Sequence, residues 1–188
     1  MRRGCSPDGR PRARDDMRIP LENCEVRSFL PTDASSIARH ANNRKIWINL
    51  RDGFPHPYSI EDAVVFIAFA LSEKPETALA IAVDGRAVGA IGFRILPDVE
   101  RVTAEVGYWV GEAFWGKGIV TEVLSAMTPW AIETHGLTRI FAVPFEWNAA
   151  SMRVLEKVGY VFEGRMRRSA IKDGKIVDQL LYAHVVPA

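Results

Sequence analysis

Residues Glu105–Thr121, EVGYWVGEAFWGKGIVT, place a strand, a glycine-rich turn and the start of a helix in direct succession. The pattern up to Val110 is typical of a strand, and the apolar residues after Ile119 recur with helical spacing. The amides of the intervening turn, Gly111–Gly118, point outward together, next to the partial positive charge of the helix N-terminus. Such an arrangement is suited to binding a phosphate or a pyrophosphate.

Gly116 and Gly118 favour this anion-binding interpretation, because a side chain at either position would keep an anion away from the backbone. Glycine-rich turns before helices are common, however, and many serve only a tight connection. No Gly-Lys-Ser/Thr follows at P-loop spacing, and the preceding strands look antiparallel rather than βαβ. These two departures argue against a P-loop and against a dinucleotide-binding fingerprint, and a nucleotide-binding α/β domain is kept as a further alternative.

On both sides of this stretch, the sequence predicts a mixed α/β fold with a largely antiparallel sheet. Pro129 predicts a kink or an early end in the helix that follows the glycine-rich turn. A loop is expected over Asn49–Tyr58, where glycine and prolines interrupt any periodicity. The expected strands are Glu25–Leu30, Ala78–Val83, Ala87–Leu96, Val102–Val110, Arg139–Phe145, Val161–Ile171 and Ile176–Val185, and the expected helices are Ala34–Ala41, Ile60–Leu71, Ile119–Glu133 and Ala149–Val158.

Composition narrows the class of protein. The chain has 188 residues, of which 48% are hydrophobic and 25% charged, as in an ordinary single globular domain. A net charge of +1 argues against nucleic acid as a partner, and no apolar run approaches the ~20 residues needed to span a membrane. Cys5 and Cys24 form no disulfide framework and no paired metal-ligand spacing, so both are interpreted as reduced thiols of a cytoplasmic protein.

The N-terminus differs in composition from the rest of the chain. Residues 1–20 are rich in Arg, Gly, Pro and Asp and have little to bury, which predicts a flexible extension. A basic arm with a function of its own, or a start codon placed too early, are the other interpretations. Residues 21–188 are expected to form one domain.

A second informative window is Asn148–Gly159. Asn148, Ser151 and Leu155 recur at helical spacing, so a carboxamide and a hydroxyl share one helix face above an apolar stripe. Asn148 and Ser151 could equally do no more than cap the helix.

The two windows together resemble the GNAT acetyltransferase superfamily, in its RimJ/RimL-type branch of ribosomal-protein N-terminal acetyltransferases. The resemblance runs from Cys24 to the C-terminus and implies a twisted, mostly antiparallel sheet of about seven strands, splayed in the middle and flanked by about four helices. The sequence departs from the family pattern at Trp115, where the general motif has Arg or Gln, and at Val120, where it has a small residue. Leu155 stands where many relatives have a tyrosine acid.

By this resemblance, acetyl-CoA would lie between Glu105–Val110 and Arg139–Phe145. The pantetheine arm would bond to the backbone of Tyr108, Trp109 and Val110 and to the side chain of Asn148, with Ser151 near the thioester sulfur. The pyrophosphate would lie on the turn formed by Trp115, Gly116, Lys117, Gly118, Ile119, Val120 and Thr121.

The resemblance also implies chemistry at Glu105 and Ser151. A lysine-like amine, with a pKa of about 10.4, is roughly 1 part in 2,500 neutral at pH 7, and an α-amine is about 1 part in 10 neutral, so a base helps both. Glu105 occupies the position of the superfamily's general base, although it could instead be a solvated strand carboxylate. Ser151 is the candidate donor to the leaving sulfur.

The sequence thus predicts an acetyl-CoA-dependent N-acetyltransferase whose acceptor is a peptide or protein N-terminal α-amine or a small-molecule amine. A non-catalytic acyl-CoA-binding module is the alternative, suggested by Leu155 and Val120. Trp47, Phe54 and Tyr58 lie in the stretch that by this resemblance overhangs the acceptor site, and some of them are expected to line it. We expect no metal, nucleic acid or membrane partner, and the chain to be a monomer or a homodimer.

Overall fold

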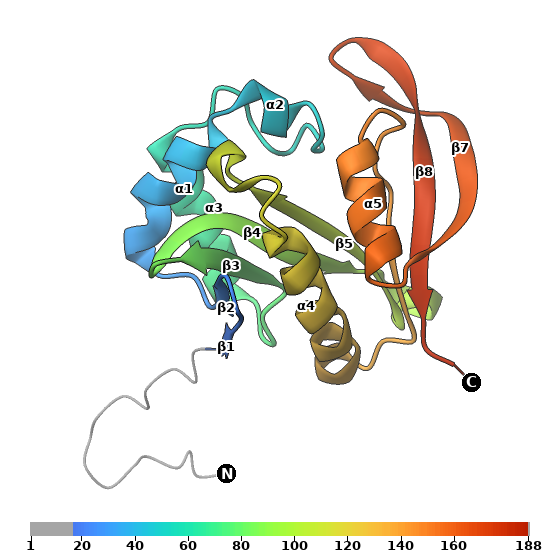
Figure 1. The fold of residues 1–188 in the computed structure, drawn as a ribbon, viewed down its shortest axis with the longest axis horizontal. Helices are drawn as coiled ribbons and strands as arrows, with labels where there is room; N and C mark the ends of the chain where they lie inside the picture. The colour runs from blue at the N-terminus through green and yellow to red at the C-terminus, as the bar shows by residue number, and fades with distance from the viewer. Residues whose placement is uncertain (1–16, 188) are drawn as a thin grey trace, which may run out of the picture.

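The computed structural model describes residues 17–187 and is built on one eight-stranded sheet (Figure 1). The strands lie in the order β1-β2-β3-β4-β5-β6-β8-β7. Neighbours are antiparallel except β5 and β6, which are parallel. The strands are β1 Arg18–Pro20, β2 Glu25–Arg27, β3 Ala78–Val83, β4 Arg86–Ile95, β5 Thr103–Val110, β6 Arg139–Ala142, β7 Val161–Lys172 and β8 Lys175–Val185; the helices are α1 Ala34–Ala41, α2 Arg44–Trp47, α3 Ile60–Ser72, α4 Ile119–His135 and α5 Ala149–Lys157.

The predicted mixed α/β class is confirmed, with one strand and one short helix more than expected. β1 has three residues and pairs with β2 through Ile19 and Val26, so the folded part begins before Leu21. α2 has four residues. Both elements are too short to produce a periodic pattern in the sequence. The interpretation of residues 1–16 as an extension, and Cys5, lie outside the described residues.

The helices cover both faces of the sheet (Figure 1). α4 and α5 pack on one face, where Leu124, Met127 and Leu155 join the main core. α1 and α3 pack on the other face around Ile37 and Ile67. Side chains alternate along a strand, so each strand of the middle of the sheet sends residues into both cores.

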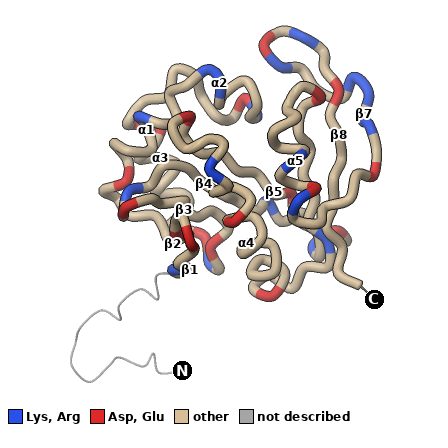
Figure 2. Tube along the Cα trace, viewed as in Figure 1, with Lys and Arg blue, Asp and Glu red and all other residues tan. Residues whose placement is uncertain are grey.

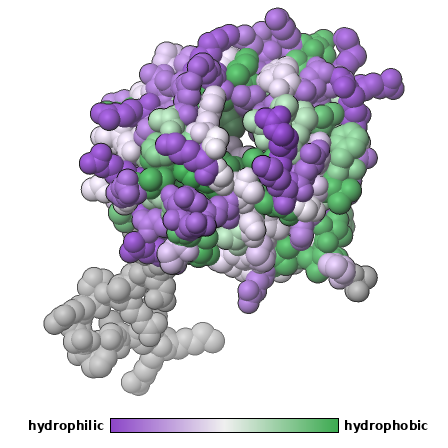
Figure 3. All heavy atoms as spheres, viewed as in Figure 1, coloured by the Kyte–Doolittle hydropathy of each residue, from purple (hydrophilic) through white to green (hydrophobic). Residues whose placement is uncertain are grey.

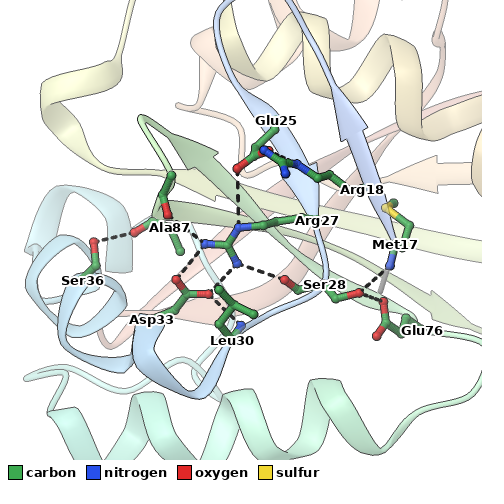
Figure 4. A network of polar contacts seen from close by, with 11 residues as sticks. Met17, Arg18, Glu25, Arg27, Ser28, Leu30, Asp33, Ser36, Glu76 and Ala87 are labelled. Carbon is green, nitrogen blue, oxygen red and sulfur yellow. Dashed lines mark hydrogen bonds and ion pairs between the residues drawn. The ribbon is translucent and has the colours of Figure 1, made fainter. Parts of the chain in front are cut away.

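A buried ion pair fixes the turn between β2 and α1 (Figure 4). Two nitrogens of the Arg27 guanidinium donate to the two carboxylate oxygens of Asp33, at 2.7 and 2.8 Å. The amide of Leu30 also donates to Asp33, and the carboxylate of Glu25 lies 3.7 Å from Arg27. Because the chain turns toward Asp33, the strand ends at Arg27 and not at Leu30 as expected.

The sheet opens in its middle. β5 pairs with β6 only over Thr103–Glu105, whereas its pairing with β4 continues to Val110. Beyond Phe141 the chain of β6 moves away from β5, toward an isolated bridge between Phe145 and Gln179. The expected splay is therefore present, and it begins at Glu105.

Pro129 does not end α4, which continues to His135 and stops at Gly136 in a left-handed conformation. Of the two expected outcomes, a kink or an early end, the early end does not occur, because core contacts at Leu124, Met127 and Ala131 hold the helix on both sides of the proline. None of the helices within residues 17–187 is long and apolar enough to cross a membrane. Acidic and basic residues are interspersed along the trace, in line with the net charge near zero (Figure 2).

Candidate active site

A cleft of about 1080 Å³ occupies the splay between β5 and β6. Its walls come from β4 and β5, from the first turns of α4 and α5, and from the segment between α2 and α3. The space-filling view shows the molecule hollowed between α2, α4 and α5 (Figure 3). The cleft thus lies where the resemblance expected the coenzyme.

The edge of β5 that faces the cleft has free backbone groups. The carbonyl of Thr103 accepts from Leu96, and the amide of Gly111 donates to Val88. Ladder bonds alternate in an antiparallel pair, so the odd-numbered residues of β5 bond to β4 and the even-numbered ones face β6. The amide of Val106 completes the last pairing with β6, at Phe141, which leaves the carbonyl of Val106 and the backbone of Tyr108 facing the gap. The carbonyl of Val110 faces the same way but accepts from the indole of Trp115 at 2.8 Å. An extended amide-bearing ligand could bond along this edge as an added strand.

The N-terminus of α4 opens into the same cleft. Gly118, Ile119, Val120 and Thr121 all line it, and the helix has no side-chain cap. Within residues 17–187 no group accepts from the amides of Ile119–Thr121, and the first intrahelical bond is donated by Glu122. Unpaired amides at a helix N-terminus form an anion site.

The two glycines of the turn have a second reason to be glycine. Gly116 and Gly118 have φ of +73° and +78°, a left-handed conformation that other residues adopt at a cost. No atom lies within 4 Å of where a Cβ would stand at either residue, so the space in front of them is open. Lys117 between them does not line the cleft, and its ammonium lies over the ring of Phe114.

The N-terminus of α5 contributes hydroxyl and amide groups. Asn148 caps the helix, because its side-chain oxygen accepts from the amide of Ser151 at 3.2 Å. The hydroxyl of Ser151 lies 2.8 Å from the phenol of Tyr108, a contact that the sequence reasoning missed. Burial raises the pKa of Tyr108 to about 12, against the opposing effect of the Ser151 hydrogen bond, so the phenol stays protonated at neutral pH. Leu155 is fully buried in the core and offers no acid.

Glu105 lies on the opposite face of β5, at the point where the strands part. It is 8% exposed, which excludes the alternative of a solvated strand carboxylate. One carboxylate oxygen accepts from Arg51 and the other from Arg94. Neither arginine was singled out from the sequence. Arg94 could have been found there, because it stands directly opposite Glu105 on the neighbouring strand.

Aromatic rings cover the half of the cleft that contains Glu105, which we call the acceptor half. Phe54 contacts Tyr58 and Trp109, with ring centroids 4.8 and 5.6 Å apart, and all three line the cleft. Burial, with a smaller contribution from Asp62, raises the pKa of Tyr58 to about 12. Phe54 and Tyr58 are thus the members of the expected aromatic set that line the cleft, and Trp47 does not line it.

Trp47 instead anchors the tip of the β7–β8 hairpin. The ammonium of Lys172, whose side chain is 1% exposed, lies 3.7 Å from the centroid of the Trp47 ring and donates to Asp52 at 2.8 Å. Arg44 pairs with Asp173 at 2.6 Å. These contacts fix the segment after α2 to the C-terminal hairpin.

Among residues 17–187 no group of three or more His, Cys, Asp or Glu side chains could hold a metal ion. Of the residues predicted to bind the coenzyme, all except Lys117 line the cleft. Arg153 and Lys157 of α5 line it as well and add positive charge beside the N-terminus of α4.

Comparisons with known proteins agree with this geometry. The family described as "Acetyltransferase (GNAT) domain" matches residues 24–161. An uncharacterized N-acetyltransferase of Bacillus subtilis, YoaA, is 33% identical over 72% of this chain and 78% of its own length. The ribosomal-protein-serine acetyltransferase of Escherichia coli is 27% identical over 53% of this chain and 55% of its own.

Solved structures share the fold. Mycobacterium smegmatis RimJ in complex with CoA-disulfide superposes with a TM-score of 0.79, at 24% identity, over 89% of this chain and 86% of the other. The open β5 edge and the uncapped N-terminus of α4 thus belong to a fold seen in a protein that holds coenzyme A. The chain is therefore an N-acetyltransferase that belongs to the GNAT family and resembles its RimJ/RimL-like ribosomal-protein branch.

Proposed function

We propose that this enzyme takes the acetyl group from acetyl-CoA and transfers it to a primary amine by direct attack of the amine on the thioester. The observation that carries the proposal is the set of unbonded amides at Ile119–Thr121, beside the open edge of β5 and in the same cleft. One elongated ligand with a diphosphate at one end and amides along its length matches both features.

The donor would be held by three parts of the cleft. The diphosphate would accept from the amides of Ile119–Thr121, where the helix dipole favours negative charge. The pantetheine amides would bond to the carbonyl of Val106 and to the backbone of Tyr108. The carboxamide nitrogen of Asn148 is left for the same arm, because only its oxygen is used in capping the helix.

The gap in the sheet lets the two substrates meet from opposite faces. Tyr108 and Ser151 lie on the α4 and α5 side, and Glu105 lies on the α1 and α3 side. In the reaction the N–C bond to the acetyl carbon forms and the C–S bond breaks. Glu105 would take the proton of the amine, directly or through a water molecule.

The hydroxyl pair would assist the departing sulfur. A phenol with a pKa of about 12 does not protonate a thiolate with a pKa near ~8.5, since the transfer is uphill. Tyr108 and Ser151 would therefore stabilise the negative sulfur by donating a hydrogen bond, and the thiolate would take its proton from solvent. This role gives Ser151 a part in the chemistry besides its place in the helix cap.

The acceptor would be an N-terminal α-amine of a peptide or protein, or a small-molecule amine. The relatives with ribosomal-protein substrates support the first class. A cytoplasmic site of action, an enzyme without metal, nucleic-acid or membrane partners, and a monomeric or homodimeric state stay predictions.

The test is release of free thiol from acetyl-CoA with a panel of amines. Loss of a general base costs about 10²- to 10⁴-fold in rate, so we expect Glu105→Gln to lower kcat by that order while calorimetry shows coenzyme affinity unchanged. Glu100→Gln is the control, because Glu100 is an exposed carboxylate in a surface turn. Coenzyme binding without turnover on any amine would instead favour a non-catalytic acyl-CoA-binding module.

A further inference from the structure

The buried carboxylate of Glu105 is bound by two arginines whose side chains are largely exposed to solvent. The side chain of Glu105 is 10% exposed, whereas those of Arg51 and Arg94 are 64% and 61% exposed. Both arginines line the cleft. They approach from different elements, Arg94 from β4 and Arg51 from the segment that follows α2. The carboxylate is thus enclosed, whereas the two guanidinium groups that bind it are exposed to solvent in the cleft.

Among the described residues 17–187, Arg51 and Arg94 each form an ion pair with Glu105 and with no second carboxylate. Lys45 is already paired with Glu112. Glu73, at the end of α3, lines the cleft and makes no ion pair with any residue of 17–187. The cleft therefore presents the guanidinium groups of Arg51 and Arg94 together with the carboxylates of Glu105 and Glu73. Groups of both signs suit a molecule that carries both an ammonium and a carboxylate.

An amine that approaches Glu105 meets an obstacle. Each oxygen of the carboxylate already accepts from an arginine, so an amine must either share an oxygen at its second lone pair or approach after a guanidinium moves away. A displaced guanidinium loses a charge-assisted hydrogen bond unless another anion takes it up. The planar guanidinium fork matches a carboxylate in two-point contact, so an acceptor with its own carboxylate compensates for the loss.

We infer that the acceptor carries a carboxylate close to the reacting amine, and that Arg51 and Arg94 bind it and thereby release Glu105. This inference rests on the proposed acetyl transfer. The carboxylate can come from two sources with the same chemistry, the α-carboxylate of a free amino acid or the side chain of Asp or Glu next to a peptide N-terminus. We expect Arg51 to make the main contact with the acceptor's carboxylate, because Arg51 lies in a connecting segment whereas Arg94 lies in a paired strand.

The test compares acceptors that differ in the carboxylate alone. One pair is a C-terminally amidated peptide beginning Ser-Asp against the same peptide beginning Ser-Asn, and a second pair is a free amino acid against its α-amide. We expect kcat/KM to favour the carboxylate by about tenfold or more in one pair, the order of one hydrogen bond to a charged group. The pair that responds identifies the source of the carboxylate.

The role of the arginines is tested by the ratio of kcat/KM for the two acceptors of a pair. The acceptors differ in amine basicity, but this difference is the same for wild type and variant, so it cancels when their ratios are compared. In Arg51→Gln and Arg94→Gln we expect the preference to fall to about twofold or less, since glutamine keeps a donor but not the charge. Arg39→Gln, which changes an exposed arginine of α1 outside the cleft, should keep the full preference.

Three results would overturn the inference. If the arginines only position Glu105, both members of a pair would slow equally in Arg51→Gln and the ratio would stay at its wild-type value. Equal kcat/KM for acid and amide in wild type would remove the inference and leave acetyl transfer intact. Coenzyme binding with no thiol release on any acceptor would remove the proposed function together with the inference.

Discussion

Gly118→Ala is expected to weaken coenzyme binding by about 10- to 100-fold. The residue has φ +78° at the start of α4 and lines the cleft, with open space where its Cβ would stand. A methyl group there would occupy the space in front of the amides of Ile119–Thr121. Loss of one hydrogen bond to a charged group amounts to about 1.5–3 kcal/mol, which is the stated range in affinity. Calorimetric titration with CoA measures it directly.

The far end of the same helix offers a matched control. Gly136 ends α4 with φ +63° and also has nothing within 4 Å of its Cβ position, so Gly136→Ala carries the same backbone strain without touching the cleft. The left-handed conformation costs an alanine about 1–2 kcal/mol, and both variants should therefore melt about 2–8 °C lower than wild type. Equal losses of coenzyme affinity in the two variants, or none in Gly118→Ala, would refute the assignment of the anion site.

Four further outcomes are expected. Leu155→Ala should lower the free energy of unfolding by about 2–5 kcal/mol in urea titrations, because it empties a fully buried core position. Arg27→Met should cost about 3–5 kcal/mol by leaving Asp33 buried without its partner, and adding Asp33→Leu should recover part of the loss. Burial, with a smaller effect of a neighbouring arginine, lowers the pKa of His40, so the folded state binds a proton there less readily than the unfolded state. The free energy of unfolding therefore decreases as pH falls below about 6.5, and His40→Gln should reduce that decrease between pH 7.5 and 5.5. Burial followed by the nearby carboxylate of α4 raises the pKa of Cys24 to about 11, so Cys24→Ser should keep acetyl transfer, and slow alkylation at neutral pH checks the protonated thiol.

The long elements and the turns between them could be predicted from the sequence, because their signals are local. Gly118 and Ile119 mark the start of α4, and the Asp173-Gly174 turn places the β7–β8 hairpin. The short elements β1 and α2 could not be predicted, since three or four residues carry no period and their position depends on tertiary contacts.

The environment of the catalytic candidates depends on contacts across the chain, which no local pattern encodes. Arg51 lies 54 residues before Glu105, and Ser151 lies 43 residues after Tyr108. The sequence thus indicated which residues could take part in the chemistry. The pairs that they form, and therefore the state of each group before the substrates arrive, required the structure.

The buried ammonium of Lys172 has a consequence for attempts to redesign the acceptor preference. The hairpin that carries it is joined through Trp47 and Asp52 to a segment 120 residues earlier in the chain. A chimaera that grafts only one of these two pieces from a relative would strand a lysine in an apolar setting, at a cost in folding. The segment that carries Trp47 and Asp52 and the hairpin that carries Lys172 should therefore be exchanged together.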